Sequence, residues 1–226
     1  MPPGDGLVPK PPDGIRPGQL GVVLLGQVII GDVAATLVDL ALRQLLRVQE
    51  PDGDGTDWLL GPLDSSAPRH RSESLLGYER TLLHGLSSGG STVTMSSLAP
   101  RMADILEDTR RALIHDGVNR GWLHHLHHDQ RTPDGEQLAE RIRVFHRRLR
   151  QYATDQGEGA LAGPLLPYAL HFGMVGHEDV PLIQLARHWV SSFSGLPGWH
   201  PPVPRAPNPL DDPVPLNNDW SGYRRW

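Results

Sequence analysis

The most informative segment of the chain is GDVAATLVDLALRQLLRVQEPDGDGTDWLL, residues 31–60, because its apolar pattern changes from a helical period to an alternating one. Its first half predicts a helix with one apolar stripe, formed by Val33, Leu37, Leu40, Ala41 and Leu45. Asp32 is the predicted N-cap, whose side chain accepts free N–H groups of the first turn. Residues 45–50 then alternate like a strand, and a turn at 52–55 leads to a partner strand at 58–60. A helix followed by a β-hairpin forms the second half of a winged helix.

A related order of elements follows along the chain. Residues 75–86 predict a helix and residues 92–95 a short strand. A long helix comes next, and its apolar side contains Leu98, Met102, Ile105, Leu106, Thr109 and Leu113. Gly117 closes this helix, and Gly121-Trp122-Leu123 follows. We therefore predict tandem winged-helix-like units over residues 19–123.

The rest of the chain predicts more helix and two irregular ends. A long helix over 136–153 directs Leu138, Ile142, Phe145, Leu149 and Tyr152 inward, and a last helix covers 180–193. These helices form a part, residues 131–200, that is expected to pack on the two units. Proline and glycine are concentrated at both ends, which predicts a disordered arm over 1–18 and a Pro-rich tail over 201–226. The predicted fold class is mainly α with small β-hairpins (α+β), with the tandem units followed by a helical C-terminal part.

The composition argues against several classes of protein. The chain has no cysteine, which excludes a disulfide scaffold and cysteine-based metal sites. Its net charge of -5 makes nucleic-acid binding unlikely, because such binding depends on neutralising phosphates. The most apolar run, residues 20–30, is too short to span a bilayer, and the N-terminus has no pattern of a secretory signal. We expect a soluble, cytoplasmic protein without membrane attachment.

A series of short motifs resembles domain-of-unknown-function family 2207, which is described as predicted bacterial membrane proteins. The first motifs are Gly14-Ile-Arg-Pro-Gly-Gln-Leu-Gly21 and Asp32-Val-Ala-Ala-Thr-Leu-Val-Asp-Leu-Ala41. The later ones include Leu76-Gly-Tyr-Glu79, Gly121-Trp122, Arg131-Thr132 with Gly135, and Leu166-Pro-Tyr-Ala169 with Gly173 and Trp189. The resemblance covers roughly residues 14–200 in the right order. It implies the winged-helix-like fold of the family's cytoplasmic part, and it implies no reaction.

The chain departs from the family pattern in two ways. We expect it to lack the outer β domain with its membrane anchor. It also lacks the hydrophobic membrane hairpin that family members commonly carry between the Gly-Trp and Arg-Thr motifs, where this chain has only LHHLHHDQ, residues 123–130. The chain therefore looks like a soluble version of the cytoplasmic part, and membrane attachment is not carried over.

Arginines on the long helix are the first candidate binding residues. Arg143, Arg147 and Arg150 belong to a basic face that also contains Arg141 and Arg148, and guanidinium groups bind carboxylates and phosphates. The alternative is a solvated face whose arginines pair with Glu136 and Glu140 on the same helix. Tyr168 is a candidate for lining a groove with Trp189 and Trp199, although such aromatic residues more often belong to the core.

The histidine-rich run is the candidate metal site. On a helix, His124 and His128 would share one face, which suits zinc or nickel. The alternative is a solvated junction, and we expect neither a structural metal nor any other cofactor. The run lacks the glutamate of the HExxH pattern, so a metalloprotease reaction would have no base.

Three functions follow from these features. The first is a non-catalytic protein- or peptide-binding accessory or adaptor protein. The second is a small biosynthetic accessory enzyme that uses the histidine cluster. The third is a winged-helix DNA-binding regulator, although acidic residues on both candidate recognition helices would repel phosphates. A protein or peptide partner is therefore the expected ligand. The sequence leaves the oligomeric state open.

The tail generates a prediction that concerns Trp220, Tyr223 and Trp226, candidate anchors for a hydrophobic groove on this protein or on a partner. Seven prolines in residues 201–226 prevent regular helix or strand, so the segment is expected to be extended. Deleting it should leave the helical content almost unchanged by circular dichroism while weakening a partner contact or self-association. Unfolding of the truncated protein would instead place the tail in the core.

Overall fold

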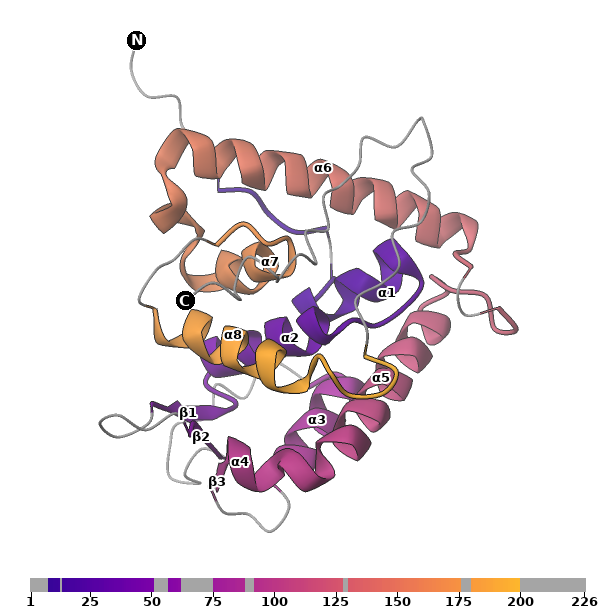
Figure 1. The fold of residues 1–226 in the computed structure, drawn as a ribbon. Coiled ribbons are helices and arrows are strands. Elements are labelled where there is room, and N and C mark those ends of the chain that lie inside the picture. The colour runs from indigo at the N-terminus through magenta and orange to yellow at the C-terminus, as the bar shows by residue number, and fades with distance from the viewer. Residues whose placement is uncertain are drawn as a thin grey trace.

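The fold is mainly helical with one small antiparallel sheet (Figure 1). It was obtained as a computed structural model, and it describes residues 8–12, 14–50, 57–61, 75–87, 92–127, 130–175 and 180–199. The α+β class predicted from the sequence is confirmed at this level. The predicted N-terminal arm is described only in part, and the Pro-rich tail lies outside the described residues.

Helix α2 (Ile30–Leu42) is the centre of the fold. It contacts the 3-10 turn η1 (Pro17–Gln19), helix α7 (Leu166–His171) and helix α8 (Pro181–Phe193). The sequence predicts one buried stripe, but nearly all of this helix is buried. Small side chains at Ala34 and Ala35 allow neighbours to approach faces that would otherwise be solvated.

Asp32 has a different role from the predicted one. The N-cap of α2 is Ile29, and Asp32 lies within the first turn. Its fully buried carboxylate accepts hydrogen bonds from the backbone N–H groups of Ile29 (2.8 Å) and Gly21 (3.0 Å). The N-cap prediction is therefore wrong, because the carboxylate reaches back to the N-cap and to helix α1 (Leu20–Leu25).

Glycine at position 21 is required by this contact. A Cβ atom placed on Gly21 would lie 2.0 Å from Oδ2 of Asp32, far inside a normal contact. The glycine at 18 faces the same helix, since a Cβ there would lie 2.0 Å from Oγ1 of Thr36. The two glycines of the Arg16–Gly21 motif therefore let the N-terminal segment lie directly on α2.

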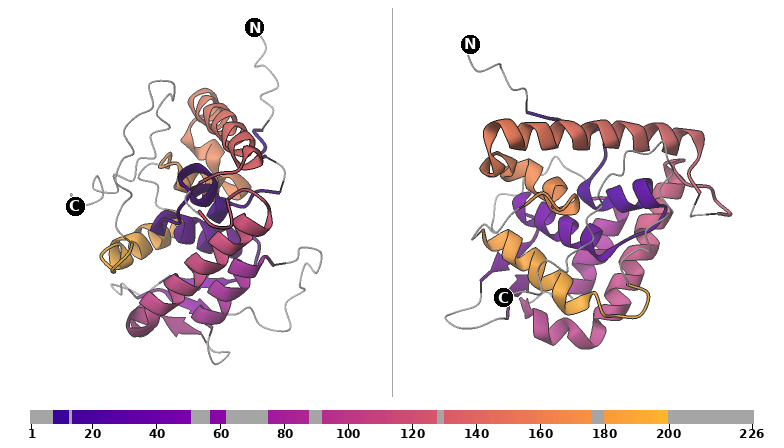
Figure 2. Two further views of the ribbon diagram at one scale, coloured as in Figure 1. Left: turned by 90° about the vertical axis from the view of Figure 1, so that its right-hand side faces the viewer. Right: turned by 45° about the horizontal axis from the view of Figure 1, so that its top comes forward.

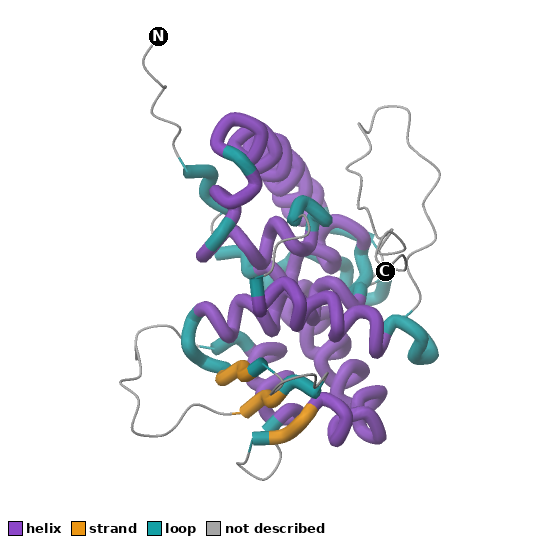
Figure 3. The backbone as a smooth tube through the Cα atoms, turned by 60° about the vertical axis from the view of Figure 1, so that its left-hand side comes forward, coloured by secondary structure: helices purple, strands orange, loops and turns teal. Residues whose placement is uncertain are grey.

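The sheet joins segments that were assigned to both predicted units. Strands β1 (Arg47–Gln49) and β2 (Leu59–Gly61) pair antiparallel with Val48 opposite Leu60, which confirms the predicted hairpin. Strand β3 (Val93–Thr94) pairs with the free edge of β2. Figure 3 shows the three strands together at one end of the molecule. The predicted short strand at 92–95 thus completes the sheet that the first hairpin begins.

Helices α3 (Gly77–Leu86) and α5 (Met102–Asn119) pack against each other beside the sheet. The long helix predicted to begin near Leu98 is divided into α4 (Met95–Leu98), the turn η2 (Ala99–Arg101) and α5. Pro100 lies in this division, and proline has no N–H group for a helical hydrogen bond. The predicted helix at residues 75–86 is confirmed almost to its ends.

Helix α6 (Pro133–Gln156) is the longest helix described and runs along one edge of the molecule (Figure 2). Thr132 is its N-cap and accepts a hydrogen bond from Gly135 N–H at 3.1 Å. Arg131 fixes the start of the helix, since its guanidinium donates to the carbonyls of Val23 (3.3 Å) and Leu24 (2.8 Å) at the end of α1. The turns η3 (Glu158–Leu161) and η4 (Gly163–Leu165) then lead into α7. None of the helices in the described part combines the length and apolarity needed to span a membrane.

The position of Asp32 generates a stability prediction. Replacing Asp32 with Ala leaves two buried N–H groups without their acceptor, so we expect a loss of roughly 3 kcal/mol in the free energy of unfolding. Urea denaturation should show a lower midpoint with an unchanged slope. The matched control is Asp104→Ala, which removes an exposed carboxylate from the first turn of α5 and should cost less than about 1 kcal/mol. Equal losses in the two variants would contradict the role assigned to Asp32.

Candidate binding surface

Helix α6 has two chemically distinct sides. Its inner side buries Leu138, Ile142, Phe145 and Leu149, as the sequence predicts, whereas Tyr152 is only half-buried. The outer side carries Arg141, Arg143, Arg147, Arg148 and Arg150. The helix therefore holds a row of cations at the edge of the molecule while its apolar side fixes it to the body.

Arg143, Arg147 and Arg150 lie along one flank of α6, at helical spacings of four and three residues, and together they are called the arginine face. Glu140 pairs with Arg143 at 3.3 Å and with Arg147 at 3.4 Å. Within the described ranges, Arg150 has no ion pair. The alternative pairing with Glu136 is not used, because Glu136 pairs with Arg131 at 2.7 Å. Among the described residues, one carboxylate thus pairs with two of the three cations.

The ion pairs of the arginine face contribute little to the stability of the fold. The Arg147 and Glu140 side chains are each 57% exposed, and exposed pairs contribute no more than about 1 kcal/mol. Helix α5 offers a contrast, since Arg110 and Arg111 both pair with Glu107, and Arg111 also lies 3.8 Å from Asp108. Charge on the exposed side of α5 is balanced locally, whereas charge on α6 is left in excess.

His146 lies on the inner side of α6, between the residues of the arginine face in sequence. It is 3% exposed, and its ring stacks on Phe172 with 4.4 Å between centroids. Its Nε2 atom is buried and has no hydrogen-bond partner among the described residues. Burial lowers the pKa of His146 to about 4, and the charges of Arg150, His171 and Arg147 act in the same direction. His146 is therefore neutral at physiological pH.

His146 was not among the site residues predicted from the sequence. The signal was present, because position 146 follows Ile142 by four residues and precedes Leu149 by three, which places it on the apolar stripe. His171 was missed as well. Its Nδ1 lies 2.9 Å from Oδ1 of Asp32, and both side chains are fully buried. No local sequence signal connects positions 32 and 171.

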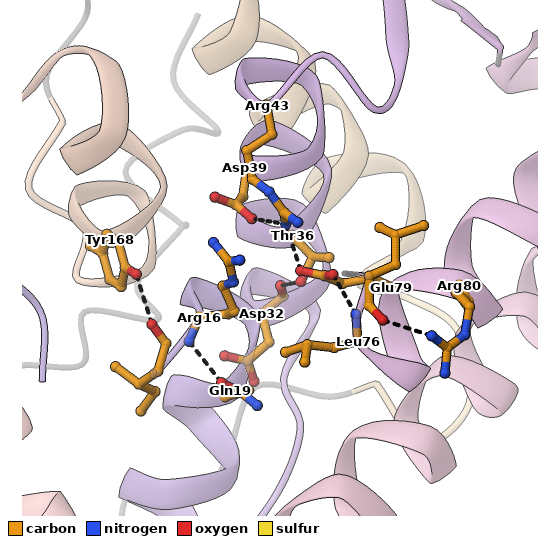
Figure 4. Close-up of polar contacts among 12 residues, drawn as sticks. Arg16, Gln19, Asp32, Thr36, Asp39, Arg43, Leu76, Glu79, Arg80 and Tyr168 are labelled. Carbon is orange, nitrogen blue, oxygen red and sulfur yellow. Dashed lines mark hydrogen bonds and ion pairs between the residues drawn. The ribbon is translucent and has the colours of Figure 1, made fainter. Parts of the chain in front are cut away.

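A cluster of polar side chains lies between α2 and α3 (Figure 4). Arg43 bridges Asp39 (2.8 Å) and the buried Glu79 (2.7 Å), and Glu79 also accepts from Leu76 N–H at the start of α3. Burial raises the pKa of Asp39, although the hydrogen bond and charge of Arg43 oppose this shift. These contacts join two helices through buried groups that bond to one another, so we assign the cluster a structural role.

Tyr168 belongs to the core, as do Trp189 and Trp199. The Tyr168 hydroxyl donates to the carbonyl of Ile15 at 2.9 Å, and burial raises its pKa above the usual value. Its ring meets Phe145 edge to face, with 5.4 Å between centroids. The tyrosine thus connects the N-terminal segment to α6 and α7, and its side chain is not presented to a partner.

The described part of the histidine run is not helical. Leu123 and Arg131 form an antiparallel bridge, and His124 N–H donates to the carbonyl of Gln130 at 3.0 Å, so the segment turns back as a short hairpin. The exposed His124 and the neighbouring His125 and His127 lie towards its tip, and His128 lies outside the described residues. The helical spacing that would bring His124 and His128 to one face is therefore not present in the described residues of this segment. Among the residues described, no three histidine or acidic side chains form a group that could hold a metal ion.

The remaining candidates, Trp220, Tyr223 and Trp226, lie outside the described residues. Comparison with known proteins adds no assignment, since no family model, curated protein or solved structure matches the chain. The arginine face is thus the part of the predicted site that the structure brings together on one flank of a helix, with Arg147 and Arg150 exposed and Arg143 half-buried.

The environment of His146 generates a prediction about acid stability. The native state keeps this histidine neutral down to about pH 4, whereas the unfolded chain takes up the proton near pH 6.5. The unfolded state therefore binds more protons between these values, and stability falls as the pH decreases from 6.5 towards 4. His146→Phe removes this dependence, so the variant should gain about 2 kcal/mol relative to the wild type between pH 7 and pH 4.5.

Urea titrations at several pH values measure this difference. The matched control is His84→Phe, because His84 is an exposed histidine of α3 and keeps its contact with water in both states. The assignment is wrong if His146→Phe and the wild type lose stability in parallel on acidification.

Proposed function

We propose that the protein is a non-catalytic, cytoplasmic accessory or adaptor protein whose arginine face binds an acidic segment of a protein partner. The observation that carries this proposal is the charge excess of α6: Glu140 pairs with Arg143 and Arg147, while Arg150 has no ion pair among the described residues, on a chain with a net charge of -5. A concentrated positive surface on an acidic protein favours a local anionic ligand over general attraction to polyanions.

The chemistry of the side chains supports a carboxylate-rich ligand. A guanidinium group is planar and presents paired N–H donors that match the two oxygens of a carboxylate. The axial rise of about 1.5 Å per residue separates Arg143 from Arg150 by about 10 Å, which suits several acidic side chains on one segment. Because α6 is fixed by its buried side, the arginines are held in place before a ligand arrives.

The proposed evolutionary relation is to the cytoplasmic part of family 2207. The motifs that suggest it coincide with residues that organise this fold, such as Gly21 and Asp32 at the centre and Arg131 at the start of α6. We also propose that the mainly helical fold contains a pair of winged-helix-like units. The order α3, β3, α4, α5 and the hairpin at 123–131 fits the second unit, and α2 with β1 and β2 fits the end of the first.

The two alternative functions have less support. A DNA-binding regulator would need an exposed recognition helix, but α2 is almost completely buried and the charges exposed on α5 include its own carboxylates. An accessory enzyme would need a set of converging ligands or bases, and the described histidines of the 123–131 hairpin do not form one.

Binding of a fluorescent decaglutamate peptide tests the proposal through anisotropy. We expect saturable binding that weakens with added salt and becomes at least about ten-fold weaker in Arg147→Ala/Arg150→Ala. The matched control is Arg110→Ala/Arg111→Ala, which removes equal charge from α5 and should reduce affinity much less. Equal losses in the two double variants would indicate general charge attraction and would contradict a site on α6.

Photo-crosslinking in the native cell extends the test to a real partner. A photoreactive residue at Thr154, which is exposed one turn beyond Arg150, should capture a specific protein. Adding Arg147→Glu/Arg150→Glu should abolish the adduct, while adding Arg110→Glu/Arg111→Glu should preserve it. An adduct that persists after charge reversal on α6 would contradict the proposal.

A further inference from the structure

A buried histidine lies directly beneath the arginine face. His146 precedes Arg147 in sequence and lies one helical turn before Arg150, but its ring points inward and stacks on Phe172. The imidazole is 3% exposed, and its Nε2 atom has no hydrogen-bond partner among the described residues. The imidazole of His146 is therefore held in a low-polarity environment, and it feels the charges of Arg147 and Arg150, which would bind the ligand.

The charged and titratable groups around His146 come from three helices. On α6 these are Arg147 and Arg150, whose positive charges oppose protonation of the imidazole. On α7 it is His171, whose ring packs edge to face on Phe172 with 5.2 Å between centroids. Phe172 is also the residue on which the His146 ring stacks. On α2 it is Asp32, whose Oδ1 lies 2.9 Å from Nδ1 of His171. The arginines are thus the neighbours of His146 that a ligand on the outer surface can neutralise.

We infer that His146 is coupled to the arginine face, so that an anionic ligand on Arg147 and Arg150 promotes proton uptake by His146. This inference rests on the proposed function and adds a regulation to the same site. A ligand charge placed over the two arginines offsets their field at the imidazole. Thermodynamic linkage then requires the reciprocal effect, so the ligand binds more tightly where His146 is protonated.

The direction and size of the effect follow from the pKa of His146, which burial and the arginines hold at about 4. If the ligand raises this pKa by about one unit, its affinity increases about two-fold between pH 7 and pH 5. The ligand therefore binds more tightly as the pH falls, for a reason that is independent of titration of the ligand itself.

The test uses polyvinyl sulfonate, whose charge is constant over this pH range. The ring C–H signals of His146, assigned with the His146→Phe variant, are followed by NMR from pH 7 to pH 4. We expect the ligand to raise the midpoint of the His146 titration by about half a unit or more. In Arg147→Ala/Arg150→Ala, the midpoint should already be raised without ligand and should not rise further with it.

The possible outcomes separate the coupling from the site itself. Binding that requires Arg147 and Arg150, with no change in the His146 titration, overturns the coupling and leaves the proposed function standing. Absence of binding, or binding that Arg110→Ala/Arg111→Ala weakens equally, overturns the site and the coupling with it. In His146→Phe, affinity at pH 7 should equal that of the wild type, while the increase at pH 5 should be smaller by about two-fold.

Discussion

The buried carboxylate of Asp32 is the interaction on which the rest of the structure depends. It accepts the N–H groups of Gly21 and Ile29 and lies 2.9 Å from His171, so it contacts α1, the start of α2 and α7 at once. A buried carboxylate is costly unless its oxygens are satisfied. The segments that satisfy it are therefore held at fixed positions around α2.

The outer surface follows from this arrangement. Because α7 and α8 cover α2, the central helix offers almost no surface to a ligand. The charged side chains that a ligand could reach therefore lie on the peripheral helices. Tyr168 on α7 meets Phe145 of α6, and Arg131 attaches the start of α6 to the end of α1. The arginines of α6 are consequently presented on a helix that is fixed along its length, which reduces the entropy lost on binding.

The sequence predicted the local elements well where a periodic pattern was long or a turn was explicit. The β1–β2 hairpin followed from alternation around an Asp-Gly turn, and α3, α6 and α8 followed from apolar side chains at helical spacing. Helix α1 was not predicted, because it has only six residues and is almost entirely apolar. The break at Pro100 was also missed, although proline gives a known signal for it.

The roles of individual polar residues could not be predicted as well. Asp32 was interpreted as an N-cap because sequence shows only its neighbours along the chain, whereas its structural partners include His171. Tyr168 needed a distant acceptor, and the one it uses is the carbonyl of Ile15. The arginine face was identifiable because its members lie on one helix at regular spacing, so local geometry was sufficient.

The most direct measurement of the central claim is the NMR signal of each arginine Nε–H group during titration with decaglutamate at neutral pH. We predict saturable shifts for Arg143, Arg147 and Arg150, which have only Glu140 as an ion-pair partner among the described residues. Much smaller changes are expected for Arg110 and Arg111, which lie beside two carboxylates, Glu107 and Asp108. Uniform small shifts over all surface arginines, or shifts centred on α5, would contradict it.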